Sequence, residues 1–383
     1  MPGYQFQSPN KLIVEAGAAA RIGDIAAALH ADSVLLVSDR GVERAGLLER
    51  PLQHLRERGM AVELFVEVEA DPSAATVEAA AARARACRAD CVIAIGGGSP
   101  MDVAKLAALL ANGDVALDAI YGVGNARGTR LPLVLVPTTA GTGSEVTPIS
   151  IVTTGEGEKK GVVSEILLPD IAVLDAELTL GLPAHVSAAT GIDAMVHAIE
   201  AYTSKRLKNP ISDCLAREAL RLLGANLARV CTNGADVVAR EAMLVGANLA
   251  GMAFANAPVA AVHALAYPVG ARFHVPHGLS NSLVLPAVMR FNLSHAAPLY
   301  AELASLLLPA IGGSESARAE ALIGWLGDAA ARLGLPVRLS QVGIGADDLP
   351  QLADDAMLQT RLLMNNPRDV GYEDALAIYR EVA

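Results

Sequence analysis

The 383-residue sequence predicts an N-terminal α/β domain built on a parallel sheet, followed by an all-helical C-terminal domain. Its length suggests two domains, because a domain usually has about 150 residues. In the first half, short β-branched runs alternate with alanine-rich stretches, which is typical of a parallel sheet with helices. After about residue 182, strand-like runs become rare. We therefore expect domains at residues 1–182 and 183–383, with a hinge around Gly181 and Pro183.

Five strands are expected in the first domain, each a short run rich in Val, Ile and Leu. They are SVLLVSD (33–39), VELFVEV (62–68), CVIAIGG (91–97), LPLVLVP (131–137) and ISIVTT (149–154). Helices are expected between them at 18–30, 42–58, 73–88 and 100–112. This alternation predicts that helices cover both faces of the parallel sheet.

Composition limits the function classes to which the chain can belong. Hydrophobic residues make up 52% and charged residues 19% of the chain, which favours a packed interior over disorder. The formal net charge is −11 and no basic run interrupts it, so neither nucleic acid nor an anionic membrane is an expected partner. The sequence shows no signal peptide and no run of about 18 apolar residues, so the expected location is the cytoplasm. The four cysteines lack metal-site spacing and are expected to be reduced, mostly buried thiols.

The stretch CVIAIGGGSPMDVAK (91–105) combines a buried strand, a glycine turn and the start of a helix. Gly96, Gly97 and Gly98 would let the backbone adopt positive φ and approach a ligand closely. The expected N-cap, N1 and N3 residues of the helix are Ser99, Pro100 and Asp102. Free N–H groups and the positive end of the helix dipole then form a site for a phosphate, although such turns also occur for steric reasons alone.

A second polar loop, VPTTAGTGSEVT (136–147), follows another predicted strand. Its hydroxyl groups, at the same edge of the sheet, belong to Thr138, Thr139, Thr142 and Ser144. Asp39 ends the first predicted strand, where a carboxylate can bind a ribose 2′-OH and repel a 2′-phosphate, which favours NAD over NADP. The alternative for Asp39 is a helix-capping or turn aspartate. Because this acid precedes the glycines, the chain lacks the ordinary dinucleotide fingerprint, in which the glycines come first.

The helical run GIDAMVHAIEAY places Asp193 and His197 four residues apart, about 40° apart on one helix face. A carboxylate and an imidazole in this arrangement form half of a metal site; alternatively, Asp193 orients His197 in a packed helix. His263 and His277 lie downstream and would complete a set of three imidazoles and one carboxylate, suited to Fe²⁺ or Zn²⁺ with positions open for substrate. Spacing does not exclude His274 in place of His277.

Taken together, these motifs resemble those of the iron-containing (group III) alcohol dehydrogenases. The matching stretches, in the family's order, are GGGSPMDVAK, PTTAGTGSEVTP, LPDIAVLDAELT, GLPA with ATGIDAMVHAIEAY, GMAFANAPVAAVHALAYPVG and PHGLSNSLVLP. They span nearly the whole chain. The resemblance implies a Rossmann-like, NAD-binding α/β domain, similar to that of dehydroquinate synthase, followed by a helical metal-binding domain.

Roles for individual residues also follow from the resemblance. Metal coordination is implied for Asp193, His197, His263 and His277. Cofactor contacts are implied for Asp39, Gly97, Gly98, Ser99, Asp102, Thr138, Thr139, Thr142 and Lys160. Many members carry a second histidine four residues after the third ligand, where this chain has Tyr267. We expect Tyr267 in the catalytic site, where either its hydroxyl carries the proton or the proton leaves through the cofactor ribose and water.

The implied activity is reversible hydride transfer between a small alcohol and the nicotinamide of NAD, with the metal binding the alcohol oxygen. Phe254, Tyr267 and the stretch around Val259 are candidates either for a weakly polar substrate pocket or for ordinary core packing. The N-terminal run YQFQSPNKLIVEAG is a candidate strand for pairing across a homodimer or higher assembly. Rival functions are an oxo-acid reductase like maleylacetate reductase, a zinc polyol dehydrogenase, and a non-catalytic NAD-binding sensor or assembly protein. The complete ligand set disfavours a metal-free reductase.

Overall fold

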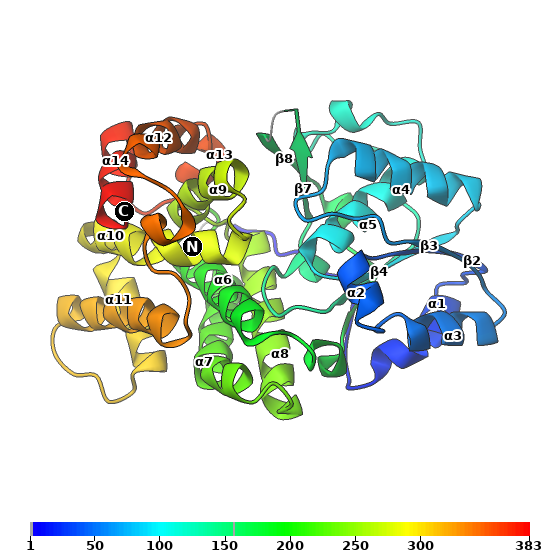
Figure 1. Cartoon of the computed structure of the whole chain (residues 1–383), viewed down its shortest axis with the longest axis horizontal. Coiled ribbons are helices and arrows are strands. Elements are labelled where there is room, and N and C mark those ends of the chain that lie inside the picture. Colours follow the sequence, from blue (N-terminus) through cyan, green and yellow to red (C-terminus); the bar gives the residue numbers. More distant parts are fainter. Residues whose placement is uncertain (1–2, 156–157) are drawn as a thin grey trace. The chain divides into compact units, whose positions relative to one another are not determined.

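The computed structural model describes residues 3–155 and 158–383, and its contacts divide the chain into two compact units (Figure 1). One unit is Gln7–Gly181 and the other is Leu182–Ala383, with which residues 3–6 are grouped. The first unit is α/β and the second is helical. The predicted fold class is therefore confirmed.

A parallel sheet forms the centre of the first unit and, within the described residues, has the strand order β1-β9-β6-β4-β2-β3. The strands are β1 (Lys11–Val14), β2 (Ser33–Val37), β3 (Ala61–Phe65), β4 (Cys91–Gly96), β6 (Leu133–Pro137) and β9 (Ile171–Leu174). Neighbouring parallel strands present their carboxyl ends at one edge of the sheet. There β4 and β6 end in register, with Gly96 beside Pro137, so the two polar loops that follow them start side by side.

Helices cover both faces of this sheet. They are α1 (Ile22–Ala27), α2 (Arg40–Arg44), α3 (Glu49–Glu57), α4 (Ala74–Ala86) and α5 (Gly98–Ala111). Side chains of α1 and α3 pack with Leu36 and Ile93 on one face, whereas those of α4 and α5 pack with Leu35 and Val92 on the other. Because successive side chains of a strand point to opposite faces, these strands must be apolar on both sides, which explains their continuous apolar runs.

Three local predictions made from the sequence are wrong. The run ISIVTT forms β7 (Ile149–Thr154), but β7 pairs antiparallel with β8 (Glu158–Val163) in a separate small sheet completed by β5 (Gly122–Val123). Its side chains alternate in burial, as expected for a half-exposed antiparallel strand. The helix expected at 42–58 is broken into α2 and α3 because Gly46, with φ of 74°, turns the chain between them. Of the four free cysteines, Cys91 is buried and the others are exposed or half-buried.

In the second unit, residues 184–383 are all described and contain helices without strands. The helices are α6 (Ala184–Thr203), α7 (Pro210–Thr232), α8 (Val237–Asn256), α9 (Ala261–Phe273), α10 (His277–Leu307), α11 (Glu315–Arg332), α12 (Leu349–Met357), α13 (Thr360–Leu363) and α14 (Tyr372–Glu381). By length and composition α8 is apolar enough to cross a membrane, but 61% of its apolar window is buried inside the unit, where it packs on α6 and α7. A core helix explains α8 without a membrane. The cytoplasmic location stays a prediction.

Candidate metal and nucleotide sites

Helix α6 carries two of the predicted metal ligands. Asp193 and His197 lie four residues apart on it, and both side chains are buried. Close packing of α6 against α7 helps to set the rotation of the helix, since a Cβ at Gly191 would lie only 2.5 Å from Leu227 Cδ1. The rotation places the carboxylate and the imidazole on the side of α6 that faces α9 and α10.

The other two ligands come from helix starts. His263 lies in the first turn of α9 and is buried, whereas His277 is the first residue of α10 and its side chain is 32% exposed. Each of the four predicted ligands offers one atom, and these atoms all lie within 4.8 Å of one another. His274, the alternative to His277, is exposed at the C-terminal end of α9 and does not belong to this group.

A glycine brings α10 close enough to α6 for this convergence. A Cβ at Gly278 would lie 2.5 Å from the carbonyl oxygen of Ala189 and 3.2 Å from Cβ of Asp193. No side chain larger than hydrogen fits there without movement of the α6 backbone. The absence of a side chain at this position therefore sets the distance between His277 and the ligands of α6.

The donor set fits a divalent cation. A tetrahedral ion with bonds of about 2.1 Å separates its ligands by about 3.4 Å, and His277 Nε2 lies 3.7 Å from Asp193 Oδ1. Burial raises the pKa of Asp193, but the three imidazoles and the Asn281 amide outweigh it and hold this pKa below its ordinary value. Burial and the neighbouring imidazoles lower the pKa of His263 well below its ordinary value. An ionised Asp193 beside a neutral His263 is the protonation state that metal ligands require.

Two polar side chains of this site were not predicted. Glu200 Oε2 lies 2.6 Å from His263 Nδ1, and Asn281 Nδ2 donates to Asp193 Oδ1 at 2.6 Å. Burial raises the pKa of Glu200 to about 7, although hydrogen bonds from backbone N–H groups oppose this rise. The spacing in the sequence could have indicated both residues. Glu200 follows Asp193 by about two helical turns and Asn281 follows His277 by about one, so each shares a helix face with a predicted ligand.

Aromatic rings adjoin the ligand set. Phe254 stacks on His197 with ring centroids 4.3 Å apart. The half-buried Tyr267 places its ring 5.9 Å from that of His277, so the residue that departs from the family pattern lies next to the predicted ligands. Val259 is also buried in this unit.

The glycine turn after β4 differs in two respects from the prediction. Helix α5 begins at Gly98 with Gly97 as its N-cap, so the helix starts within the glycines. The N-cap, N1 and N3 assignments are therefore wrong for Ser99, Pro100 and Asp102. The expected positive φ is also wrong for these glycines, since Gly97 has φ of −77° and neither Gly96 nor Gly98 is in the left-handed region. Glycine is needed for space instead, because a Cβ at Gly96 would lie 2.7 Å from Pro100 Cγ.

The threonine loop after β6 packs directly on this turn. The Thr138 N–H donates to the carbonyl of the last residue of β4 at 2.9 Å. Thr139 Oγ1 lies 3.6 Å from where a Cβ of Gly97 would be, and Thr142 Cγ2 lies 3.0 Å from that of Gly98. The structure therefore brings the predicted hydroxyl groups to the N-terminus of α5, where free N–H groups favour an anion.

A buried lysine that was not predicted ties α5 to the threonine loop. Lys105 Nζ donates to Ser144 Oγ at 2.8 Å and to the Ile149 carbonyl at 2.7 Å, and lies 3.4 Å from Asp102 Oδ1. Asp102 also accepts from Ser144 Oγ at 2.6 Å and from the Ile151 N–H at 2.9 Å. Burial lowers the pKa of Lys105, and Asp102 opposes this shift. Asp102 therefore supports the loop rather than capping the helix.

Asp39 and Lys160 have structural partners within the first unit. Asp39 Oδ1 caps α2 by accepting from the N–H groups of Gly41 and Val42 at 2.7 and 2.9 Å, so the capping alternative is confirmed. Its Oδ2 lies 3.6 Å from where a Cβ of Gly96 would be, next to the glycine turn. Lys160 lies on β8 in the small sheet and pairs with a neighbouring glutamate at 3.3 Å.

Comparison with known proteins gives consistent matches over the whole chain. The family model for iron-containing alcohol dehydrogenase matches residues 9–176, and the C-terminal model of the Fe-containing alcohol dehydrogenase family matches residues 187–383. Long-chain-alcohol dehydrogenase 1 of Geobacillus thermodenitrificans is 41% identical over 362 residues, covering 92% of this chain and 89% of that protein. The crystal structure of a 1,3-propanediol oxidoreductase superposes with a TM-score of 0.96 at 34% identity, covering 100% of both chains. Sulfoacetaldehyde reductase from Bifidobacterium kashiwanohense in complex with NAD⁺ has a TM-score of 0.89 at 28% identity, covering 100% of this chain and 99% of that chain.

Alanine substitutions in the glycine turn test the nucleotide site. In Gly96→Ala the new Cβ meets Pro100, so we expect a lower urea midpoint and about tenfold or more weaker NADH binding in a fluorescence titration. Gly97→Ala is the matched change, because the nearest atom lies 3.6 Å away. It should keep the wild-type midpoint and yet weaken NADH binding, since the added methyl group obstructs a phosphate. Unchanged NADH binding in both variants would contradict the assignment.

Proposed function

Since the chain belongs to the iron-containing alcohol dehydrogenase family, we propose that Asp193, His197, His263 and His277 hold its catalytic metal. The protein is an NAD-linked alcohol dehydrogenase. One observation carries the ligand assignment: three helices bring one carboxylate and three imidazoles within 4.8 Å of one another. This donor set suits Fe²⁺, and also Zn²⁺.

The unit Gln7–Gly181 is the proposed NAD-binding domain, and the unit Leu182–Ala383 is the proposed metal-binding and catalytic domain. Support for the first assignment is the anion site at the start of α5, enclosed by the threonine loop. The residues proposed to contact NAD there are Gly97, Gly98, Ser99, Thr138, Thr139 and Thr142. Asp39 and Lys160 are proposed to contact other parts of the cofactor, and Asp102 acts by holding the threonine loop through Ser144.

A small, weakly polar alcohol or aldehyde is the substrate class that fits the ligand set and its neighbours. A bound divalent ion supplies Lewis acidity toward the substrate oxygen. Phe254 fixes the plane of the His197 ring by stacking on it, and its apolar edge excludes water beside the ligands. The Tyr267 ring lies 5.9 Å from the His277 ring, and we assign its hydroxyl the role of proton carrier.

The N-terminal strand supports a homodimer. β1 lies at the end of the sheet order and pairs in parallel with β9. The N–H groups of Lys11 and Glu15 donate to the carbonyls of Asp170, just before β9, and of Leu174 in β9. The N–H groups of Leu12 and Val14 therefore point away from β9 toward the free edge. The side chains of Leu12 and Val14 are 41% and 43% exposed. An apolar edge strand with free N–H groups favours pairing with the same strand of a second copy.

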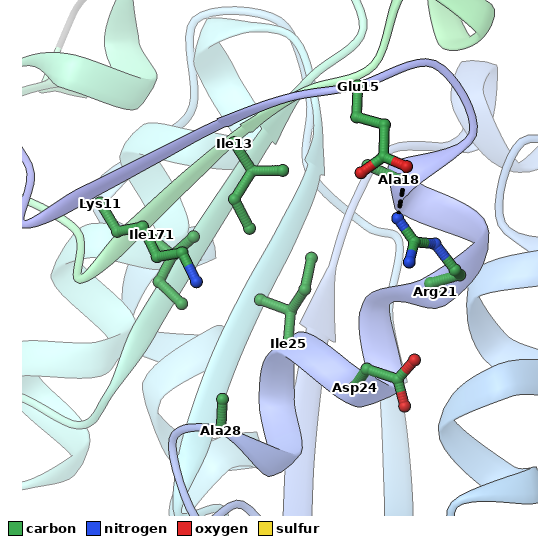
Figure 2. Close-up of a pocket in the computed structure, with 9 residues that line it drawn as sticks. All are labelled: Lys11, Ile13, Glu15, Ala18, Arg21, Asp24, Ile25, Ala28 and Ile171. Carbon is green, nitrogen blue, oxygen red and sulfur yellow. Dashed lines mark ion pairs between the residues drawn. The ribbon is translucent and has the colours of Figure 1, made fainter.

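A cavity of about 220 Å³ lies beside this edge strand. Figure 2 shows Ile13 of β1 and Ile25 of α1 on its two sides, with the ion pair between Glu15 and Arg21 at its rim. An apolar floor at the sheet edge gives room for a side chain of the second copy. The cavity therefore supports the same interface.

Proline at position 12 tests the dimer. Leu12→Pro removes an outward N–H and leaves the bonds to β9 in place, so we expect dimers to become monomers in sedimentation velocity. Leu12→Thr is the matched variant, because it keeps the N–H and the strand propensity and should remain dimeric. A monomeric wild-type protein, or a dimeric Leu12→Pro variant, would contradict the proposal.

Removal of one imidazole tests the metal site. After anaerobic purification, His263→Ala should lose stoichiometric Fe²⁺, and NADH oxidation with short aldehydes should fall by about 10³-fold or more. His274→Ala is the matched control, since His274 is exposed and outside the ligand group, and it should keep both the metal and the activity. Turnover of an oxo-acid that survives chelation would favour the metal-free reductase instead.

Cofactor preference tests the role of Asp39. Asn caps helices as well as Asp, so Asp39→Asn keeps the start of α2 and removes only the charge. Less repulsion of a 2′-phosphate should raise the ratio of kcat/KM for NADPH over NADH by about tenfold, equivalent to about 1.4 kcal/mol. An unchanged ratio with an unchanged urea midpoint would leave Asp39 as a cap alone.

A further inference from the structure

We infer that Glu200 is a positioning residue. It holds the His263 ring so that the lone pair of Nε2 points toward the other three predicted ligands. The inference rests on the ligand set proposed above and adds a residue that is not itself a ligand. Glu200 Oε2 lies 2.6 Å from Nδ1 of His263, the ring nitrogen opposite to the one that faces the other ligands. The two side chains are only 5% and 3% exposed, so no water competes for this hydrogen bond.

The hydrogen bonds of the site determine which ring nitrogen carries the proton. Asn281 Nδ2 lies 2.6 Å from Asp193 Oδ1, and because a carboxylate oxygen accepts, the amide must present its N–H₂ group there. The same Nδ2 lies 3.3 Å from His263 Nε2 and 3.2 Å from His277 Nε2, so its second N–H can point at only one of them. The other ring nitrogen of His263 faces Glu200, and an ionised carboxylate can only accept there. The proton of a neutral imidazole is then on Nδ1, where Glu200 accepts it. The lone pair of Nε2 stays available for a cation.

Glu200 also replaces a missing helix cap. Helix α9 begins after Ala260, whose side chain cannot cap the helix, and the first N–H groups of a helix lack internal partners. Glu200 Oε1 accepts from the Val262 N–H at 2.7 Å, so one carboxylate satisfies α9 through one oxygen and His263 through the other. The Glu200 carboxyl group also lies at the positive end of the α9 dipole, which favours its ionised form. Both contacts act on the same turn, because His263 is the residue after Val262.

The spacing on α6 makes this arrangement possible. Asp193, His197 and Glu200 occupy positions separated by four and three residues, which share one face of an α-helix. One helix thus provides two ligands and the carboxylate that orients a third ligand on α9. A rigid link of this kind couples His263 to Asp193 and His197 through α6 rather than through the metal alone.

Glu200→Gln tests this inference through metal affinity. The amide oxygen of Gln can accept from the Val262 N–H, but its N–H₂ group then faces Nδ1 and stabilises the tautomer with the proton on Nε2. We expect Co²⁺, titrated anaerobically against a competing chelator, to bind about 10- to 100-fold more weakly, with an altered visible absorption spectrum. Asp175→Asn is the matched control: Asp175 is a buried carboxylate that accepts backbone N–H groups of Gly17 and Ala19 in the other unit. It should lower stability without changing the Co²⁺ affinity.

The outcomes separate this inference from the ligand assignment. If Asp193→Asn and His263→Ala lose Co²⁺ binding while Glu200→Gln binds it as the wild type does, the ligand set stands and the role of Glu200 is wrong. If Glu200→Gln only lowers the urea midpoint, as Asp175→Asn does, Glu200 is a helix cap and nothing more. If His263→Ala retains full Co²⁺ affinity, the ligand set itself is wrong.

A measurement on the wild-type protein covers the case in which Glu200→Gln does not fold. In metal-free protein labelled with ¹⁵N-histidine, the His263 resonances are identified by their absence in His263→Ala. The ¹⁵N shifts should show the proton on Nδ1 and a bare Nε2. A proton on Nε2 would overturn the inference.

Discussion

The C-terminal unit depends on one geometric constraint: four donor atoms from three helices must meet within a few ångströms in a buried space. Burying a carboxylate and three imidazoles is costly unless each has a partner, and here hydrogen bonds supply partners for Asp193, His263 and His277 before any ion is considered. Asn281 satisfies Asp193, and Glu200 satisfies His263. Helix packing at Gly191 and Gly278 sets how closely the backbones approach. The site is therefore shaped by helix contacts that involve none of the ligand atoms.

In the N-terminal unit, a buried cation likewise depends on hydrogen-bond partners. Lys105 is fully buried and gives its hydrogen bonds to the loop after β6, with Asp102 as its charged neighbour. Together they hold the threonine loop against the glycine turn, where the chain has no side chains to make contacts of its own. A flexible glycine segment thus acquires a defined shape from one lysine three residues beyond Asp102 on the same helix.

Features that depend on spacing within one element could be read from the sequence, and features that depend on packing could not. Asp193 and His197 were predicted to share a helix face because four residues make about one turn. The start of α5 was predicted wrongly, since Ser99 and Pro100 are typical of a helix start and only the folded backbone shows that the helix already begins at Gly98. The strand ISIVTT was assigned to the wrong sheet because its pairing partner, β8, lacks a strong apolar run. Glu200 was overlooked as an acid in an apolar helix, because its partner His263 is 63 residues away.

The uneven burial of the four ligands has a kinetic consequence. Asp193, His197 and His263 are enclosed by packed helices, whereas His277 has a side chain that is 32% exposed at the first residue of its helix. Rotation of His277 about its side-chain bonds opens a path to solvent without disturbing the core. An ion held by these four residues would then exchange with solvent on the side of His277. The other three donors, enclosed by packed helices, would keep their arrangement without it.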